Sequence, residues 1–248
     1  MRWRVISFAR RTAYENMAID EAVGEAITRG GSPPTIRFYG WDPSAVSIGC
    51  FQSMEEEVDL ESCRALGVDR VRRRTGAGAV YHDREGEITY SVLCPLDMIQ
   101  EDISLSYRRV CGWLIDGLGR LGMEAEFRPI NDILVQGKKI SGSAQTRRGG
   151  VFLQHGTLLY DLDLRRMFSV LKVGMAKISD KGIARFQDRV TSVREQVDAS
   201  REEVMEALVQ GFTAGKEWEY GDLYPLEERR MKELVEERYS RDEWNLSR

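Results

Sequence analysis

The stretch Arg72-Arg-Arg-Thr-Gly-Ala-Gly-Ala-Val-Tyr-His-Asp83 carries the first signs of chemistry in this chain. Three arginines run into a loop of small residues that ends at a tyrosine, a histidine and an aspartate. Glycine permits positive φ angles and close approach of backbone N–H groups to a ligand, and such a loop can hold a phosphate. Guanidinium groups beside it suit a phosphate or a carboxylate. The stretch matches neither the P-loop nor the dinucleotide-binding pattern, and a hairpin turn with solvated arginines explains it equally well.

A second stretch reads Asn131-Asp-Ile-Leu-Val-Gln-Gly-Lys-Lys-Ile-Ser-Gly-Ser-Ala-Gln145. Alternating apolar residues lead to a turn at Gln136-Gly137, and Lys138-Lys139 then enters a run of small residues. A lysine there could neutralise charge where a carboxylate meets a phosphate, although most lysines are simply exposed. The small residues at 141–144 favour a ligand site or close backbone packing.

A third stretch, Val151-Phe-Leu-Gln-His-Gly-Thr-Leu-Leu-Tyr-Asp161, reads as an apolar strand interrupted by His155-Gly156-Thr157. A lone histidine on a strand is more often structural than catalytic. A glycine within a strand indicates close approach by a ligand or by another part of the chain.

The remaining pattern predicts an α+β fold. We expect helices over residues 13–28, 105–121 and 227–239, and one that begins at a capping box formed by Ser200 and Glu203. Strands are expected at 35–39, 45–49, 68–72 and 87–93. These strands come in hairpin-like pairs, and the strand at 87–93 is expected to pair with the strand segment before it. The sheet should therefore be mixed and mostly antiparallel, with helices flanking it.

Composition excludes several classes of protein. The chain has 248 residues and a formal net charge of −4, which argues against a nucleic-acid-binding surface. No signal peptide and no apolar run of about 18 residues is apparent, so we expect a cytoplasmic protein without a membrane segment. The four cysteines form no C-x-x-C pair, and two histidines are too few for a Cys/His zinc site. Buried, reduced thiols are the expected state.

Together the three stretches resemble the lipoate–protein ligase family, within the wider group of biotin and lipoate ligases and octanoyl transferases. The residues that carry the resemblance are 73–83, 131–132, 137–144 and 155–159, in that order, with supporting segments at 16–22, 36–41 and 239–245. The resemblance covers nearly the whole chain, and four ordered motifs are far more specific than one glycine loop.

The resemblance implies one catalytic domain over residues 1–248, with the biotin/lipoate ligase fold that is related to class II aminoacyl-tRNA synthetases. It implies that lipoate and ATP with Mg²⁺ form lipoyl-adenylate. A lysine of an acceptor lipoyl domain then attacks the adenylate. The acceptors implied are 2-oxoacid dehydrogenase acyltransferase subunits or the glycine-cleavage H protein.

The resemblance also assigns site residues. Lys139 matches the motif lysine that holds the acyl carbonyl and the phosphate. Asn131 and Asp132 match a pair near the nucleotide, where Asp132 would contact Mg²⁺. The other matching positions in the ATP and lipoyl-adenylate site are Arg73, Gly76, Gly78, Ala79, Val80, Tyr81, His82, Gly142, Ala144, His155, Gly156 and Thr157.

Two departures from the family pattern stand out. Ala77 replaces the middle of three consecutive glycines, a change that is tolerable if its φ angle is negative and costly if it is not. We also expect no accessory domain of the kind that follows the catalytic domain in many single-chain ligases. We therefore expect a separate small accessory subunit to be needed for adenylate formation.

Three rival interpretations remain. An octanoyl or lipoyl transferase of the same fold needs a nucleophilic thiol, and no cysteine follows Cys111, which lies on the apolar stripe of a predicted helix. This places the transferase behind the ligase. Biotin ligase fits less well, because its signature differs from residues 73–83. A non-catalytic binder of lipoyl-adenylate or of a lipoyl domain would not need Arg73, His82 and Lys139 together. The natural acyl group, lipoyl or octanoyl, stays open.

Overall fold

A large mixed sheet forms the centre of the molecule. The computed structural model describes residues 1–161, 163–172 and 187–247. The strands are β1 (Trp3–Arg11), β2 (Thr35–Trp41), β6 (Glu87–Pro95), β7 (Ala125–Arg128), β8 (Asp132–Val135), β9 (Lys138–Arg148), β10 (Val151–Leu159) and β11 (Trp218–Tyr220). Their order is β11-β1-β2-β6-β10-β9-β8-β7. β1 runs parallel to β11 and β2, and the pairings from β2 to β7 are antiparallel. The expected α+β fold with a mixed, mostly antiparallel sheet is confirmed.

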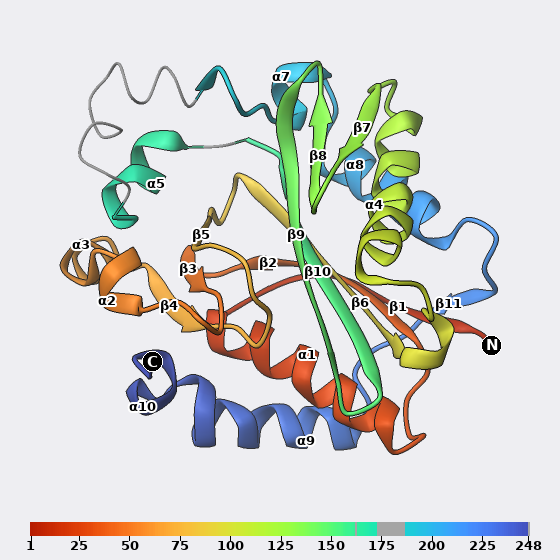
Figure 1. Cartoon of the computed structure of the whole chain (residues 1–248), viewed down its shortest axis with the longest axis horizontal. Coiled ribbons are helices and arrows are strands. Elements are labelled where there is room, and N and C mark those ends of the chain that lie inside the picture. Colours follow the sequence, from red (N-terminus) through yellow and green to blue (C-terminus); the bar gives the residue numbers. More distant parts are fainter. Residues whose placement is uncertain (162, 173–186, 248) are drawn as a thin grey trace.

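Helices cover both faces of this sheet (Figure 1). On one face lie α1 (Ala13–Thr28), α9 (Pro225–Leu234), the π-helical turn η3 (Val235–Tyr239) and α10 (Asp242–Asn245). On the other lie α4 (Ile103–Arg120) and α8 (Arg201–Thr213), with α7 (Val193–Gln196) and η1 (Leu96–Met98) nearby. The ring of Phe212 on α8 lies 5.3 Å from that of Phe38 and 4.9 Å from that of Tyr90, so α8 is held by aromatic packing on the sheet.

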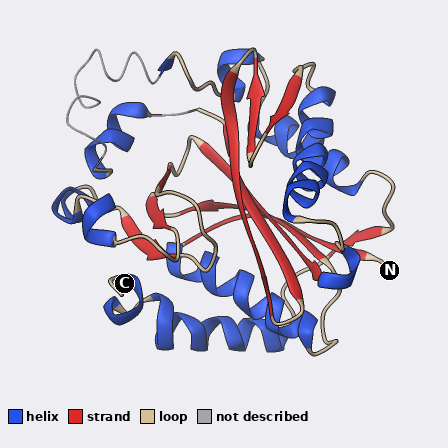
Figure 2. Cartoon of the chain, viewed as in Figure 1, coloured by secondary structure: helices blue, strands red, loops and turns tan. Residues whose placement is uncertain are grey.

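A second, three-stranded sheet stands beside the large one (Figure 2). It is formed by β4 (Asp69–Arg72), β3 (Ala45–Ile48) and β5 (Val80–His82), in that order. The helices α2 (Met54–Glu57), α3 (Leu60–Ala65) and α5 (Leu164–Val170) pack against it in a separate apolar cluster. The loop between β4 and β5 contains the small residues that follow the three arginines, so the small sheet positions that loop.

Local sequence signals placed several elements correctly. Helix α1 has the predicted bounds and begins at a capping box of Thr12 and Glu15. Helix α8 begins at the predicted capping box of Ser200 and Glu203. Gln136 and Gly137 have φ angles of 50° and 76°, the positive values that a tight two-residue hairpin requires.

Two expectations about strand pairing were wrong. The strands at 35–39 and 45–49 do not form a hairpin, because β2 lies in the large sheet and β3 in the small one. The strand at 87–93 pairs with β2 and β10, whereas β4 pairs with β3. Every residue of β2 is buried. It therefore needs sheet neighbours on both edges, and these come from distant segments.

Strand β1 was not predicted, and its sequence contains three arginines, which are uncommon in buried strands. Arg4 is in fact buried, and its guanidinium donates two hydrogen bonds to the carboxylate of Glu227, at 2.8 and 2.7 Å. A buried arginine is tolerated when its charge is paired and its donors are satisfied. Residues far apart in the sequence can supply that pairing, which a local pattern does not reveal.

Candidate active site

A cavity of about 660 Å³ opens between the small sheet and strands β9 and β10. Nearly all the binding residues expected from the sequence line it: Arg73, Gly78, Ala79, Val80, Tyr81, His82, Asn131, Asp132, Lys139, Gly142, Ala144, His155, Gly156 and Thr157. Gly76 does not line it, although its carbonyl oxygen accepts a hydrogen bond from Arg73. The structure thus brings the separate motifs to one cavity. That these residues bind a substrate stays a prediction.

Lys139 forms the charged part of one wall. Its Nζ lies 2.7 Å from Oδ1 of Asp132 on the neighbouring strand β8, and both side chains are partly exposed, at 42% and 31%. A Cβ atom added at Gly142 would lie 2.9 Å from both Cε and Nζ of Lys139. Glycine at position 142 therefore makes room for the lysine side chain. The side chain of Asn131 donates to the backbone oxygen of Ser143, which joins the turn before β8 to β9.

Arg73 lies in the opposite wall and, unlike Lys139, is buried. Its side chain is 4% exposed. Nε donates to Thr75 Oγ1, Nη1 to both oxygens of Ser47, and Nη2 to the carbonyl oxygens of Gly76 and Gly78 at 2.6 and 2.7 Å. Burial lowers the pKa of Arg73 to about 10. Because its donors are already engaged, Arg73 is poorly placed to bind a phosphate directly. It instead orients the loop that contains Gly76, Ala77 and Gly78, here called the glycine loop.

The glycine loop presents its amides away from Arg73. In a planar trans peptide the carbonyl and the following N–H point in opposite directions. With the carbonyls of Gly76 and Gly78 turned toward the guanidinium, the N–H groups of Ala77 and Ala79 point the other way. No residue that the structure describes accepts a backbone hydrogen bond from either amide. Both alanines line the cavity, so the two amides are candidate donors to a bound anion.

Ala77 adopts the conformation that the sequence marked as costly. Its φ angle is +69°, in the left-handed region, where an L-residue costs roughly 1–2 kcal/mol. A Cβ atom at Gly49 would lie 2.2 Å from the carbonyl oxygen of Ala77. The loop is therefore packed closely against residue 49, which helps to hold this strained conformation.

His82 lines the cavity but has both ring nitrogens engaged. Nδ1 lies 2.8 Å from Oε1 of Glu87, and Nε2 lies 2.8 Å from Oγ of Ser47. The ring of Trp41 stacks on it at 3.9 Å. Since Ser47 also accepts from Arg73, His82 braces the arginine wall, and it can touch a ligand only through its ring face or edge.

His155 belongs to a buried polar chain. Thr75 Oγ1 accepts from Arg73, so its hydroxyl hydrogen is free to donate to Nε2 of His155, 2.8 Å away. Nδ1 of His155 lies 3.5 Å from Oδ2 of Asp20. Burial lowers the pKa of His155, although Asp20 partly offsets this effect. Burial opposes ionisation of Asp20, but Arg37, His155 and Ser91 outweigh it and lower the pKa of that carboxyl.

Gly156 has a packing role that the sequence did not reveal. A Cβ atom there would lie 2.5 Å from the hydroxyl oxygen of Tyr90. The glycine therefore admits the tyrosine ring on the neighbouring strand β6, while it also lines the cavity.

Sequence reasoning did not identify the residues that line the apolar part of the cavity. It is lined by Met17, Tyr39, Trp41, Leu159, Met167, Leu171 and Val190. These residues come from α1, β2, β10, α5 and two loop segments. The sequence contains no signal that places such scattered apolar residues around one ligand rather than in the core. This lining gives the cavity an apolar region next to its polar walls.

None of the four cysteines lines the cavity. All are free thiols, and Cys63, Cys94 and Cys111 are buried, as expected. Burial raises the pKa of Cys111 to about 11, so this thiol is largely protonated at neutral pH and a poor nucleophile. Its Sγ lies 3.7 Å from Oγ of Ser143, which does line the cavity. Cys50 is partly exposed but lies outside the lining.

The comparison with family models identifies the chain. Residues 12–213 match the model described as the lipoyl protein ligase A/B catalytic domain. The chain belongs to the lipoyl protein ligase A/B family. The resemblance drawn from the motifs is thereby confirmed, and the fold is that of lipoate ligases. Among the described residues no helix is long and apolar enough to cross a membrane.

Curated relatives of this family member carry a transferase name. This chain is 40% identical over 271 aligned positions to octanoyltransferase LipM of Kyrpidia tusciae. It is 37% identical over 270 positions to octanoyltransferase LipM of Symbiobacterium thermophilum, and both alignments cover 98% of each chain. These names favour the octanoyl transferase alternative over the ligase that the motifs led us to expect. Both alignments are longer than the 248 residues of this chain, so these relatives contain residues with no counterpart here.

Solved structures similar to this family member carry ligase names. One is a bi-partite lipoate protein ligase from Thermoplasma acidophilum, described with its E2 lipoyl domain. It is 34% identical to this chain with a TM-score of 0.87, and the alignment covers 99% of this chain and 96% of the ligase chain. A lipoate-protein ligase A bound with ATP is 32% identical with a TM-score of 0.86, and 99% of each chain is covered. The family therefore includes proteins of both names at similar distances from this chain.

Proposed function

We propose that this protein transfers an octanoyl or lipoyl group to a lysine of an acceptor lipoyl domain. One observation carries the proposal. A single cavity joins an apolar region to two polar walls, with Lys139 on one wall and the amides of the glycine loop on the other. An acyl chain with a reactive carbonyl at one end has this same division between apolar and polar parts.

The apolar region suits a medium-length acyl chain. Leu159, Met167 and Leu171 offer no charge to a ligand, and methionine side chains adapt readily to the shape of a flexible chain. Burying the chain there would leave its carbonyl at the polar walls, where acyl transfer takes place.

The polar walls suit the charge that develops in acyl transfer. When the acceptor amine attacks the carbonyl carbon, negative charge builds on the carbonyl oxygen. Lys139 Nζ and the amides of Ala77 and Ala79 are the groups that would stabilise it, a contribution of a few kcal/mol. Asp132 would hold the Nζ atom of this lysine in place through their ion pair when no substrate is bound.

Octanoyl transfer is the first candidate reaction, because the curated relatives carry that name. The octanoyl group would arrive as a thioester on a donor. Since no cysteine lines the cavity, the acceptor amine would attack the donor directly. A C–N bond forms, the donor C–S bond breaks, and the proton lost by the amine is matched by the proton that the leaving thiolate takes up.

ATP-dependent lipoate ligation is the second candidate, and two observations favour it. A neighbour of 32% identity binds ATP, and an adenylate route needs no enzyme thiol. Asp132 is the one acidic side chain among the described residues of the lining. A Mg²⁺ ion would therefore be held mainly by ATP phosphates. The bi-partite neighbour supports a separate accessory subunit for this route and a lipoyl domain as acceptor.

The test is the intact mass of an apo lipoyl domain after incubation with this protein. One arm contains an octanoyl thioester without ATP, a second contains octanoate or lipoate with ATP and Mg²⁺, and a third contains preformed lipoyl-adenylate. A gain in the first arm supports octanoyl transfer, and a gain confined to the second supports a self-sufficient ligase. A gain only with the adenylate supports a ligase that needs a partner. No gain in any arm contradicts the proposal.

The same samples test direct transfer. The mass of the enzyme itself should stay unchanged during turnover, and the variants Cys50→Ser and Cys111→Ser should keep their activity. An acyl group found on either cysteine would overturn the direct route.

A further inference from the structure

The three adjacent arginines all bind other parts of the protein, and each connects the site to a different part of the fold. Arg73 holds the glycine loop, as described above. Arg74 lies 2.7 Å from Oε1 of Glu21 on α1. Arg72 is buried, and its guanidinium is hydrogen-bonded to backbone carbonyl groups from two distant segments.

The first of these segments is residues 49–52, which follow β3. Nη1 of Arg72 donates to the carbonyl oxygens of Gly49, Cys50 and Gln52, the last at 2.7 Å. The amide of Cys50 donates to the carbonyl of Thr75 at 2.9 Å, and Gly49 packs against Ala77. Arg72 is therefore connected to the glycine loop through this segment.

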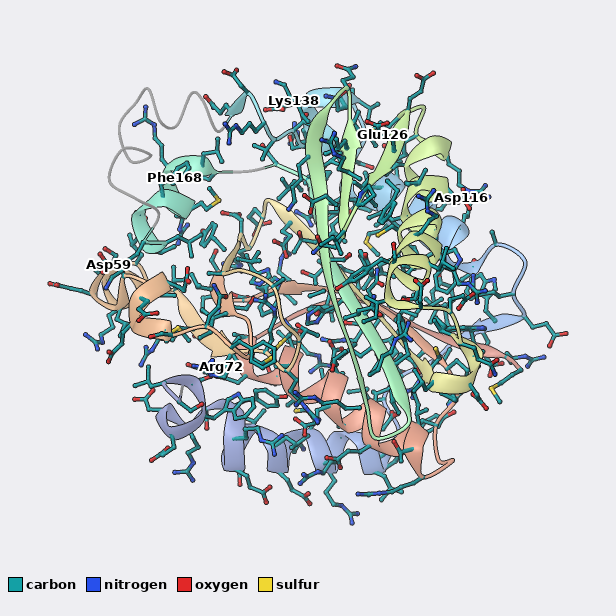
Figure 3. The ribbon with its side chains drawn as sticks, viewed as in Figure 1. Asp59, Arg72, Asp116, Glu126, Lys138 and Phe168 are labelled. Atoms are coloured by element: carbon teal, nitrogen blue, oxygen red, sulfur yellow. The ribbon has the colours of Figure 1, made fainter. Side chains whose placement is uncertain are left out.

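The second segment is the C-terminal end of the described chain. Arg72 Nε donates to the carbonyl oxygen of Trp244 at 3.0 Å, and Nη2 donates to those of Asn245 and Ser247. Two further bonds join the backbone of Arg72 to side chains of this segment. The amide of Arg72 donates to Oδ1 of Asn245, and Nε1 of Trp244 donates to the carbonyl of Arg72, both at 2.9 Å. Figure 3 shows Arg72 beside α10 and the C-terminal end of the ribbon.

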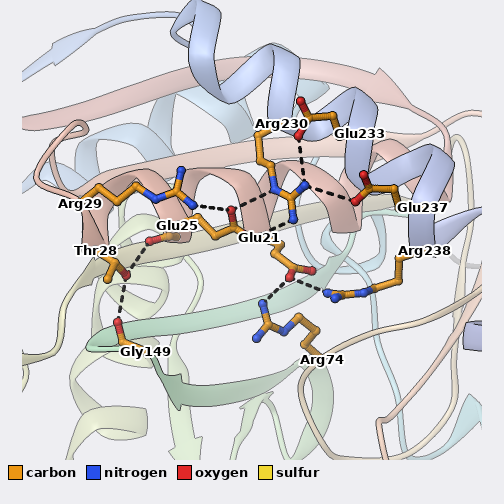
Figure 4. Close-up of polar contacts among 11 residues, drawn as sticks. Glu21, Glu25, Thr28, Arg29, Arg74, Gly149, Arg230, Glu233, Glu237 and Arg238 are labelled. Atoms are coloured by element: carbon orange, nitrogen blue, oxygen red, sulfur yellow. Dashed lines mark hydrogen bonds and ion pairs between the residues drawn. The ribbon is translucent and has the colours of Figure 1, made fainter.

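Arg74 is linked to the same C-terminal region. The carboxylate of Glu21 accepts from Arg74, from Arg238 and from the hydroxyl of Tyr239. Figure 4 shows Arg74 and Arg238 converging on the carboxylate of this glutamate. Residues from η3 to the end of the described chain thus fix the arginines on both sides of Arg73.

We propose that residues 238–247, here called the C-terminal clasp, position the glycine loop for acyl transfer. This rests on the proposed function of the cavity. None of these bonds joins the clasp to a residue that lines the cavity; the clasp acts on Arg73 only through its neighbours Arg72 and Arg74. Its residues are therefore positioning residues rather than catalytic ones.

The clasp is suited to positioning because it acts through hydrogen bonds to the backbone. Arg72 has no carboxylate partner among these contacts, and its acceptors are carbonyl groups at fixed places in the chain. Hydrogen bonds depend strongly on geometry. A small displacement of α10 would therefore shift Arg72, and with it the start of the loop.

Variants of the clasp test the proposal. Asn245→Ala removes the acceptor of the Arg72 amide, and Trp244→Phe removes one donor while keeping an aromatic ring. Leu246→Ala is the matched control, because Leu246 is partly exposed and none of the bonds to Arg72 involves it. The first measurement is hydrogen exchange in the substrate-free protein, read at the amides of Cys50 and Arg73, which Thr75 and Ile48 protect.

In Asn245→Ala we expect these two amides to exchange about tenfold faster, the effect of losing one buried hydrogen bond. Exchange in β6 and β10 should stay unchanged. With the acyl donor that serves the wild-type protein, kcat/KM should fall about tenfold through a higher KM for the donor. Trp244→Phe should give a smaller change of the same kind, and Leu246→Ala should give none.

Two results would overturn the proposal. One is exchange at Cys50 and Arg73 that matches the Leu246→Ala control. The other is faster exchange across the whole sheet together with a lower melting temperature, which would mean that the clasp only stabilises the fold. A wild-type protein without acyl transfer activity would reject the proposed function, while the exchange measurement would still decide whether the clasp holds the loop.

Discussion

The two walls of the cavity differ in how tightly their charged groups are held. Arg73 is buried, and its guanidinium is bonded to Ser47, Thr75 and the loop carbonyls. Lys139 is partly exposed, and Asp132 is its salt-bridge partner. A group that must follow changing charge on a substrate needs free donors and some freedom to move. A group with every donor engaged can only fix its surroundings. The difference indicates that Lys139 acts on the substrate and that Arg73 positions the loop.

The largest effect is expected for Lys139→Ala. It should reduce acyl transfer by roughly 10²–10³-fold, as removal of one charge-stabilising donor typically does. The melting temperature should change little, because a partly exposed ion pair contributes at most about 1 kcal/mol. Initial rates of acyl-lysine formation on a lipoyl domain provide the measurement.

Lys138→Ala is the control for that variant, since this neighbouring lysine on β9 does not line the cavity. Its activity should be normal. Normal turnover by Lys139→Ala itself would reverse the assignment of roles to the two walls.

A mixed effect is expected for Arg73→Lys. Lysine keeps the charge, but its three donors on one nitrogen cannot reach Ser47, Thr75 and both loop carbonyls together. Stability should fall by about 1–3 kcal/mol, because buried carbonyl groups lose their partners. Activity should fall at least about tenfold through loss of loop geometry. Urea unfolding and steady-state kinetics would measure the two effects. Loss of activity with unchanged stability would instead indicate that Arg73 contacts the substrate.

The smallest effect is expected in how the free energy of unfolding depends on pH. It tests the buried polar side chains behind Arg73, namely Thr75, His155 and Asp20. The pKa of His155 is lowered in the folded protein by burial, whereas an unfolded histidine titrates near about 6.5. As the pH falls below that value, the unfolded state takes up the proton first, so the folded state loses stability. Above about pH 7 the residue makes no such contribution.

His155→Gln should therefore flatten the decline in unfolding free energy between about pH 7 and pH 5. Urea unfolding at several pH values, with wild type alongside, would measure it. An identical slope in both proteins would show that His155 does not control the decline.

The two walls also differ in how much of their structure could be predicted from the sequence. Lys139, Asp132 and Gly142 lie on adjacent strands of one hairpin, whose turn at Gln136-Gly137 the sequence predicts. Local signals were sufficient for this wall. For the other wall the sequence grouped Arg73 with Gly78, and both residues line the cavity, while their role in binding stays a prediction. It did not reveal that the arginines bind the protein itself, because their partners lie in distant segments of the chain.

Three other expectations depended on information that local pattern does not hold. The apolar lining comes from elements that are distant in sequence, so no spacing identifies it. Strand β1 was not predicted, and the acidic partner that allows its Arg4 to be buried, Glu227, lies near the other end of the chain. The ranking of ligase over transferase rested on the cysteine pattern, and the names of the curated relatives favour the reverse order.

The bonds between Arg72 and the C-terminal clasp also bear on how the site is completed during synthesis. The partners of Arg72 within the clasp are separated from it by 172 to 175 residues along the chain. A ribosome delivers residues in order, and contacts of this separation can form only after the distant segment has emerged. The glycine loop is therefore made early but reaches its final geometry only near the end of synthesis. Nascent chains that stop before Trp244 should fold around their two sheets and remain weak in acyl transfer.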